Sequence, residues 1–231
     1  MPAAQIRVWH VYPETGLLQQ RAAQGLARLA AESIAARGAF RIVLAGGNTP
    51  RAIYERLRDI RTAWQSWHIY FGDERCLPSD HAERNSAMAS EAWLAHVDIP
   101  ATQIHVIPAE LGAEEAARQY ALSIESVQMF DLVLLGLGAD GHTASLFPGQ
   151  NFRPDLRQPA VQAVHQSPKP PAERVTLSAW RLGEARRVWY LVTGADKAPA
   201  VRKWRGGEHI PAAEIKPADG VDIWVDAAAF G

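Results

Sequence analysis

Residues 131–142 read DLVLLGLGADGH, so an apolar run passes directly into a glycine-rich turn. The run at 131–135 predicts a strand buried on both faces, because leucine and valine follow one another without polar alternation. Such strands belong to parallel sheets that helices cover on both sides. The turn then presents Asp140 and His142, two side chains capable of acid–base chemistry. This stretch predicts an α/β fold with a polar site at one edge of its sheet.

Short apolar runs alternate with helical patterns on either side of this segment, as in a mainly parallel sheet flanked by helices. Before the segment, we expect strands at 6–12, 41–45, 67–71 and 105–107, and helices at 15–37, 50–58, 85–96 and 113–127. After it, we expect strands at 187–193 and 223–225, with a helix between them that ends near Trp204.

Beyond Pro148 the pattern changes to short β segments that prolines interrupt, at 160–165 and 174–178. We interpret the region from about 150 to 185 as a small β-containing subsidiary lobe, or an extension of the main sheet, within one domain spanning 1–231. Hydrophobic residues make up 48% of the chain and charged residues 21%, which is typical of a globular domain.

The composition argues against several classes of protein. The formal net charge is −1, which gives no basic surplus for binding nucleic acid or an anionic membrane. Cys76 is the one cysteine, so no internal disulfide forms, and no Cys/His spacing typical of structural zinc occurs. No apolar run approaches the ~20 residues that span a bilayer, and residues 1–14 lack a signal-peptide pattern. We expect a cytoplasmic protein with a small-molecule ligand, as a monomer or a dimer.

Four polar clusters each begin where a predicted strand ends, at 46–49, 73–75, 136–142 and 194–197. In an open parallel sheet the carboxyl ends of the strands lie along one edge, and ligands bind in the crevice outside that edge. Clusters that are far apart in the sequence are therefore expected to meet in space. This convergence predicts a binding or active site.

The cluster Gly46-Gly47-Asn48-Thr49 joins a strand to a helix and is followed by Pro50, which suits the first turn of a helix. Glycines let backbone N–H groups approach an anion, and the helix N-terminus and the Thr49 hydroxyl add favourable groups. The cluster predicts phosphate binding; the alternative is a tight turn without a ligand.

The segment 136–141 formally matches the dinucleotide pattern GxGxxG. That pattern requires a full helix after the third glycine and an acidic residue about 20 positions later. Here Pro148 would cut the helix short, and the next strand, at 160–165, has no acidic residue. We therefore interpret the glycines as a frame that directs Asp140 and His142 towards a ligand.

His142 is the candidate general base, because a neutral imidazole can take a proton from water near neutral pH. Asp140, two residues earlier, would orient the ring. A lone histidine is otherwise often a surface or core residue, but a glycine-framed turn at a strand end favours a functional role. Neither a GxSxG nucleophile turn nor an HExxH zinc motif occurs.

Charged side chains at two other strand ends, and near a Pro-rich stretch, complete the candidate site. Asp73 with Glu74 could bind Mg²⁺ or act as acid and base, and Arg75 could hold a phosphate or carboxylate; the alternative is a solvated charged turn. Lys197, Arg174 and Lys169 could contribute cations for an anionic ligand. For each, the alternative is an ordinary surface residue.

Together these motifs resemble the 6-phosphogluconolactonases of the pentose phosphate pathway. The matching segments occur in the order that the family has and span nearly the whole chain. They are LAGGNTP (44–50), FGDERCLPSDHAERN (71–85), LGLGADGHTASLFPG (135–149), KPPAERVTLS (169–178) and TGADKAPAV (193–201).

The resemblance implies a modified Rossmann-like fold, shared with glucosamine-6-phosphate deaminases. It implies that 6-phosphogluconolactone is hydrolysed to 6-phosphogluconate without a metal or cofactor, by a water that His142 activates with the support of Asp140. Backbone N–H groups of the 136–142 turn are candidate oxyanion donors. The residues that the resemblance places against phosphate and sugar oxygens are Gly47, Thr49, Arg75, Arg174 and Lys197.

The chain departs from the family pattern at three positions near the expected phosphate site. Ala45 and Asn48 stand where relatives usually have serine and a hydroxyl residue, which leaves Thr49 as the hydroxyl of that turn. Arg84 stands where a small residue commonly precedes the asparagine. Two other functions are alternatives: an isomerase-deaminase acting on an amino sugar phosphate, and a non-catalytic sugar-phosphate sensor.

Overall fold

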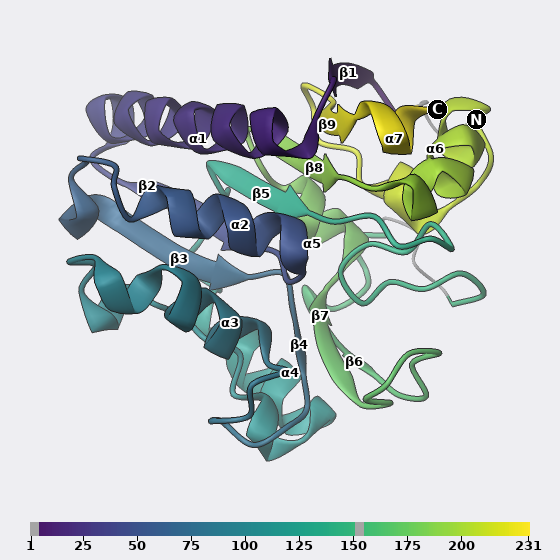
Figure 1. Ribbon diagram of the computed structural model, residues 1–231. Coiled ribbons are helices and arrows are strands. Elements are labelled where there is room, and N and C mark those ends of the chain that lie inside the picture. The colour runs from purple at the N-terminus through teal and green to yellow at the C-terminus, as the bar shows by residue number, and fades with distance from the viewer. Residues whose placement is uncertain (1–4, 151–154) are drawn as a thin grey trace.

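The computed structural model describes residues 5–150 and 155–231. Its centre is a six-stranded parallel sheet (Figure 1). The order is β1-β9-β8-β5-β2-β3, with bounds Arg7–Tyr12, Val221–Asp226, Val188–Val192, Leu132–Leu135, Phe40–Leu44 and Trp67–Phe71. β5 lies between β2 and β8 and all four of its residues are buried, which confirms the strand predicted from the apolar run.

Helices cover both faces of this sheet, as the alternation of side chains along β8 shows. The Trp189 side chain points towards Gly25 of α1 (Thr15–Arg37), whereas the ring of the next residue, Tyr190, lies 4.6 Å from that of Trp204 in α6 (Ala198–Arg205). Because consecutive side chains of a strand point to opposite faces, α1 and α6 lie on opposite sides of the sheet. The remaining α-helices are α2 (Asn48–Leu57), α3 (Asn85–Ala92), α4 (Ala113–Ser123), α5 (Ala179–Gly183) and α7 (Ala227–Phe230).

A second, three-stranded antiparallel sheet has the order β4-β7-β6, with bounds Asp73–Arg75, Arg174–Leu177 and Val161–Val164. α4 packs against β6 and β7. β4 continues from β3 after Gly72, so the small sheet begins at the carboxyl edge of the large one. The two sheets and their helices confirm the predicted fold class. The 150–185 region supplies β6 and β7, but its third strand comes from 73–75, and the division into lobes stays an interpretation.

The prediction of a strand at 105–107 was wrong. Only an isolated parallel bridge joins Ile69 to Ile104, and the His105 N–H donates to the Ile69 carbonyl oxygen at 2.8 Å. The next backbone groups of β3 on this side, the N–H and carbonyl oxygen of Phe71, are bonded to the Tyr120 hydroxyl, so the pairing does not extend into a ladder.

Two helices are shorter than predicted. α3 ends at Ala92, and the Arg58 side chain donates to the Glu91 and Ala92 carbonyl oxygens, which a longer helix would have used. Residues 94–96 form a separate 3₁₀ turn. α4 ends at Ser123 rather than near Val127.

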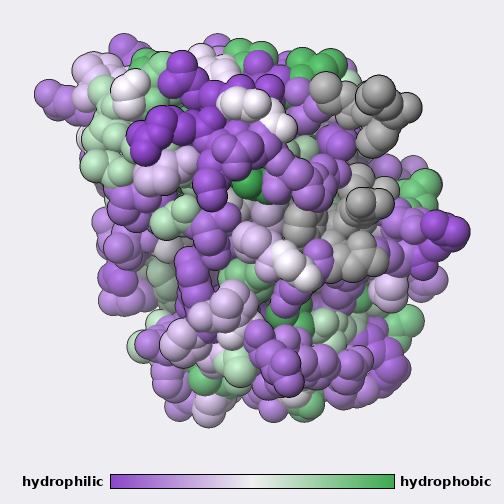
Figure 2. All heavy atoms as spheres, turned by 90° about the vertical axis from the view of Figure 1, so that its right-hand side faces the viewer, coloured by the Kyte–Doolittle hydropathy of each residue, from purple (hydrophilic) through white to green (hydrophobic). Residues whose placement is uncertain are grey.

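The face beyond the carboxyl ends of the parallel strands lies on the right in Figure 1 and towards the viewer in Figure 2, where hydrophilic side chains predominate. In the part of the chain that the structure describes, no helix combines the length and apolar character needed to cross a bilayer.

Candidate active site

A cavity of about 370 Å³ lies outside the carboxyl ends of the parallel strands. Its lining brings together the turns after β2, β3 and β5, the loop before β7, and Lys197. All four polar clusters therefore contribute to it. The polar or glycine residues among its lining are Gly46, Gly47, Gly72, Asp73, Arg75, Asn85, Gly136, Gly138, His142, Thr143, Lys169, Arg174 and Lys197.

The His142 imidazole is bonded to Asp140, which lies behind it and does not line the cavity. Nδ1 of His142 lies 2.5 Å from Oδ1 of Asp140, and the same oxygen accepts the His142 backbone N–H at 3.2 Å. Burial raises the pKa of Asp140, but the hydrogen bond from His142 and the nearby positive charges outweigh it, so the pKa lies below its usual value. An ionised carboxylate only accepts hydrogen bonds, so Nδ1 carries the hydrogen and Nε2 keeps its lone pair.

Burial lowers the pKa of His142 below 6.5, against the hydrogen bond that the ring donates to Asp140, which raises it. The ammonium of Lys169 lowers it further. Nζ of Lys169 lies 3.4 Å from Nδ1, and since that nitrogen already donates to Asp140, Lys169 acts on the ring as a nearby charge. The imidazole is therefore mainly neutral at neutral pH, as a general base must be.

Gly138 makes room for this pair. A Cβ at residue 138 would lie 1.8 Å from Nδ1 of His142 and 2.6 Å from Oδ1 of Asp140. The second glycine of the GxGxxG match is thereby explained by the space that an imidazole needs. After Gly141 the chain continues in turns, and within the described residues up to 150 there is no helix of the kind that a dinucleotide site requires.

Three backbone donors of the turn are already used. The N–H of Gly138 donates to the His142 carbonyl oxygen, and that of Gly141 donates to the Gly138 carbonyl oxygen. The His142 N–H is held by Asp140. The prediction that the 136–142 turn supplies oxyanion donors is therefore wrong for these three groups, because closing the turn consumes them.

Four cations line the cavity from three segments: Arg75, Lys169 with Arg174, and Lys197. Nη2 of Arg174 donates to the Lys169 and Pro170 carbonyl oxygens, which secures the loop that carries Lys169; burial lowers the Arg174 pKa. Nζ of Lys197 lies 2.9 Å from a carboxylate oxygen of Asp196. An anionic ligand fits this charge distribution.

Asn85 forms one wall of the cavity and was not predicted as a site residue. Its Nδ2 donates to the carbonyl oxygen and Oδ1 of Asp73, and Ser145 donates to the other Asp73 oxygen at 2.6 Å. A Cβ at Gly46 would lie 2.0 Å from Oδ1 of Asn85, so the glycine allows the two segments to approach. The signal that could have identified Asn85 is its place at the start of a helix after the charged strand end.

The alternative reading of residues 73–75 as a solvated turn is wrong, since they form β4 and the Asp73 and Glu74 side chains are buried. Glu74 does not line the cavity, and its oxygens accept backbone N–H groups. The structure therefore does not bring the two carboxylates together as a Mg²⁺ pair or an acid–base pair. Among residues 5–150 and 155–231, no group of three or more potential metal ligands is clustered.

Asn48 and Thr49 lie outside the cavity lining, whereas Gly46 and Gly47 are part of it. The Thr49 hydroxyl is instead hydrogen-bonded to the Thr193 hydroxyl, with 2.6 Å between the two oxygens. This contact connects the turn after β2 to the turn after β8. Of the three departures noted above, Ala45 lines the cavity, Asn48 is exposed, and Arg84 does not reach the cavity.

The family model for glucosamine-6-phosphate isomerases/6-phosphogluconolactonase matches residues 13–224. A probable chloroplastic 6-phosphogluconolactonase 3 from Oryza sativa is 36% identical over 230 residues, which covers 90% of this chain and 70% of that relative. A 6-phosphogluconolactonase from Mycobacterium tuberculosis is 36% identical over 211 residues, 85% of each chain. The crystal structure of 6-phosphogluconolactonase from Thermotoga maritima superposes with a TM-score of 0.88 at 25% identity, covering 96% of this chain and all of that one.

The electrostatics around His142 predict two pKa shifts of opposite sign. Asp140→Asn removes the acceptor that favours the imidazolium, so the pKa of His142 should fall further below 6.5. Lys169→Met removes a positive neighbour, so the same pKa should rise. NMR titration of the ring nitrogens measures both, with the exposed His96 as internal control. Shifts of equal sign in the two variants would contradict this account.

Proposed function

Because the chain belongs to the glucosamine-6-phosphate isomerase/6-phosphogluconolactonase family, we propose that it hydrolyses 6-phospho-D-glucono-1,5-lactone to 6-phosphogluconate in the oxidative pentose phosphate pathway. The observation that carries the proposal is the His142–Asp140 pair at the edge of a cavity lined by four cations. The cavity has a base at one side and positive charge around it. This arrangement fits a substrate in which a neutral ester is joined to an anionic phosphate. The lone cysteine, Cys76, supports a reducing compartment such as the cytoplasm.

In the proposed reaction, Nε2 of His142 takes a proton from a water molecule as the water oxygen attacks the lactone carbonyl carbon. The bond from this carbon to the ring oxygen then breaks. The imidazolium returns its proton to the ring oxygen, which leaves as the hydroxyl of the open acid. Asp140 holds the ring and stabilises the imidazolium in between.

The proposed mechanism uses no metal ion. A lactone is an activated ester, so one positioned water and one base suffice. The negative oxygen that forms at the carbonyl requires positive charge nearby, and the Lys169 ammonium beside the imidazole is available for it. The carboxylate of Asp73, which lines the cavity, is engaged by Asn85 and Ser145 and serves to hold the wall.

Arg75, Arg174 and Lys197 are proposed to bind the phosphate and sugar oxygens, with the backbone at Gly46 and Gly47. These groups do not take part in bond making. Their binding energy orients the ring so that its carbonyl faces His142.

The direct test is a stopped-flow assay on freshly generated 6-phosphogluconolactone, corrected for its spontaneous hydrolysis. Acceleration of ring opening supports the proposal. Release of ammonia from glucosamine 6-phosphate would instead identify an isomerase-deaminase. Binding of 6-phosphogluconate without any acceleration would identify a sugar-phosphate sensor.

His142→Ala should lower kcat by about 10²–10⁴-fold, because the water loses its base. Circular dichroism should show an unchanged fold. His96→Ala, at an exposed histidine outside the cavity, serves as the matched control and should retain full turnover. Near-normal turnover of His142→Ala would remove this residue from the proposed role.

Lys197→Ala should raise KM by about tenfold and change kcat less, since the ammonium holds the phosphate and not the reacting carbon. Lys203→Ala, on the exposed face of α6, is the matched control. Steady-state kinetics on the lactone separate the two constants. An unchanged KM in Lys197→Ala would place the phosphate elsewhere.

A further inference from the structure

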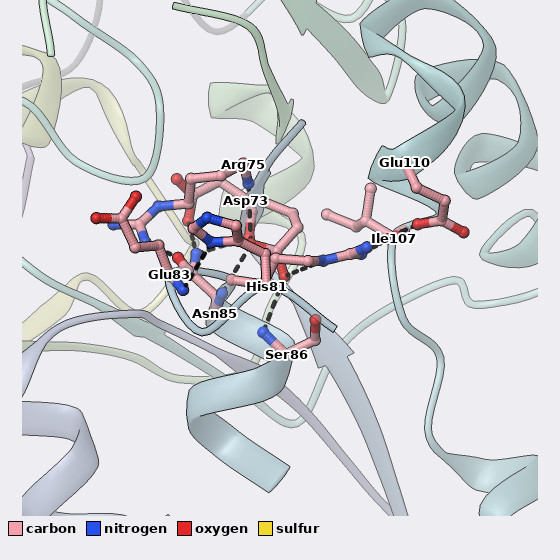
Figure 3. Close-up of polar contacts among 10 residues, drawn as sticks. Asp73, Arg75, His81, Glu83, Asn85, Ser86, Ile107 and Glu110 are labelled. Carbon is pink, nitrogen blue, oxygen red and sulfur yellow. Dashed lines mark hydrogen bonds and ion pairs between the residues drawn. The ribbon is translucent and has the colours of Figure 1, made fainter. Parts of the chain in front are cut away.

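The Glu74 side chain is completely buried and holds three backbone N–H groups. One oxygen accepts from Arg75 at 2.9 Å and from Asn85 at 2.7 Å, and the other accepts from Ser86 at 2.8 Å. Figure 3 labels the three donors of these contacts, Arg75, Asn85 and Ser86. The N-cap residue of α3 provides no side-chain hydrogen bond of its own. Glu74, from β4, therefore satisfies the first N–H groups of the helix and lies at its positive end.

Arg84 is the cation that accompanies this buried carboxylate. Its side chain is 2% exposed, and its Nε lies 3.6 Å from an oxygen of Glu74. Nη1 donates to Glu110 at 2.7 Å, and Nη2 donates to the Ile107 carbonyl oxygen at 2.6 Å. Burial raises the Glu110 pKa, but the hydrogen bond and charge of Arg84 outweigh it, so the pKa is lowered. The guanidinium thus joins β4 and the start of α3 to the segment before α4.

Two of the three residues whose backbone N–H groups Glu74 holds, Arg75 and Asn85, also line the cavity. Asn85 directs its side chain to Asp73, and Arg75 donates through Nη1 to the Glu83 carbonyl oxygen (Figure 3). One wall of the cavity is therefore fixed from behind by a carboxylate that has no access to a ligand.

We propose that Arg84 is a positioning residue for substrate binding, acting through Glu74 on Arg75 and Asn85. The identity of the substrate in this proposal rests on the proposed function. Arg84 itself does not line the cavity, so its effect falls on how well the wall is placed. The base, His142, lies on a different segment and is held by Asp140; that segment meets the wall where Ser145 donates to Asp73.

Arg84→Met should raise KM for 6-phosphogluconolactone by about tenfold while kcat changes by less than about threefold, because Glu74 is left buried without its cation. Arg84→Lys should recover part of the effect, since it restores the charge but not the planar fork that reaches Glu110 and Ile107 together. Glu110→Gln weakens the contact at the outer end of the network, so it should also raise KM, by a smaller factor. This variant replaces Arg84→Met as the test if Arg84→Met does not fold.

The matched control is Arg37→Met. Arg37 pairs at 2.8 Å with Asp131, whose side chain is 3% exposed, at the amino end of β5, and neither residue lines the cavity. This variant also strips a cation from a buried carboxylate, so it should lower stability without changing KM. A rise in KM in both variants would show general loosening and would overturn the proposal.

Amide hydrogen exchange of the substrate-free protein tests the positioning independently of catalysis. The N–H groups of Asn85 and Ser86 should exchange faster in Arg84→Met than in the wild type, and should be unaffected in Arg37→Met. Absence of lactone opening by the wild type would end the proposed function and leave this readout valid. Unchanged exchange, or a fall in kcat with KM unchanged, would overturn the positioning role.

Discussion

The parallel pairing of β5 with β2 on one side and β8 on the other is the constraint on which the rest of the molecule depends. Val133 is in register with Val43 of β2 and with Val188 of β8, so the three strands reach their carboxyl ends close together. The turns that follow therefore start from one edge. A base, a glycine-rich turn and a cationic side chain from distant parts of the sequence share one cavity for this reason.

Buried carboxylates fasten the segments around that edge. Glu74 holds the start of α3, and Asp226 accepts the N–H groups of Gly194 and Ala229, which fixes the turn after β8 and the start of α7. At the opposite end of the sheet, Asp131 accepts the Arg41 N–H and pairs with Arg37. Each of these carboxylates is buried yet bound to donors, as a buried charge requires. The cavity, by contrast, is lined by the cations Arg75, Lys169, Arg174 and Lys197.

Much of the fold was predictable because its signals are local. The helix at 15–37 and the strand at 67–71 follow from periodicity and apolar runs, and the structure has both at the predicted bounds. The placement of His142, Arg75 and Lys197 on one cavity followed from their position at strand ends. Long-range pairing was not predictable: β4 forms because β7 lies beside it, and the site role of Asn85 depends on its approach to Gly46. Three of the expected turn donors, at Gly138, Gly141 and His142, were wrong for a similar reason, since the turn and the Asp140 side chain use them.

The space beside the imidazole couples two positions of the chain. Residue 138 can carry no carbon side chain while a histidine occupies position 142 in this orientation, because the two would overlap. A lineage that replaced both His142 and Asp140 by small side chains would lift that restriction, whereas one that kept the pair would not. Glycine at position 138 is therefore expected wherever position 142 carries a histidine in this orientation. The residue types at the two positions are expected to vary together.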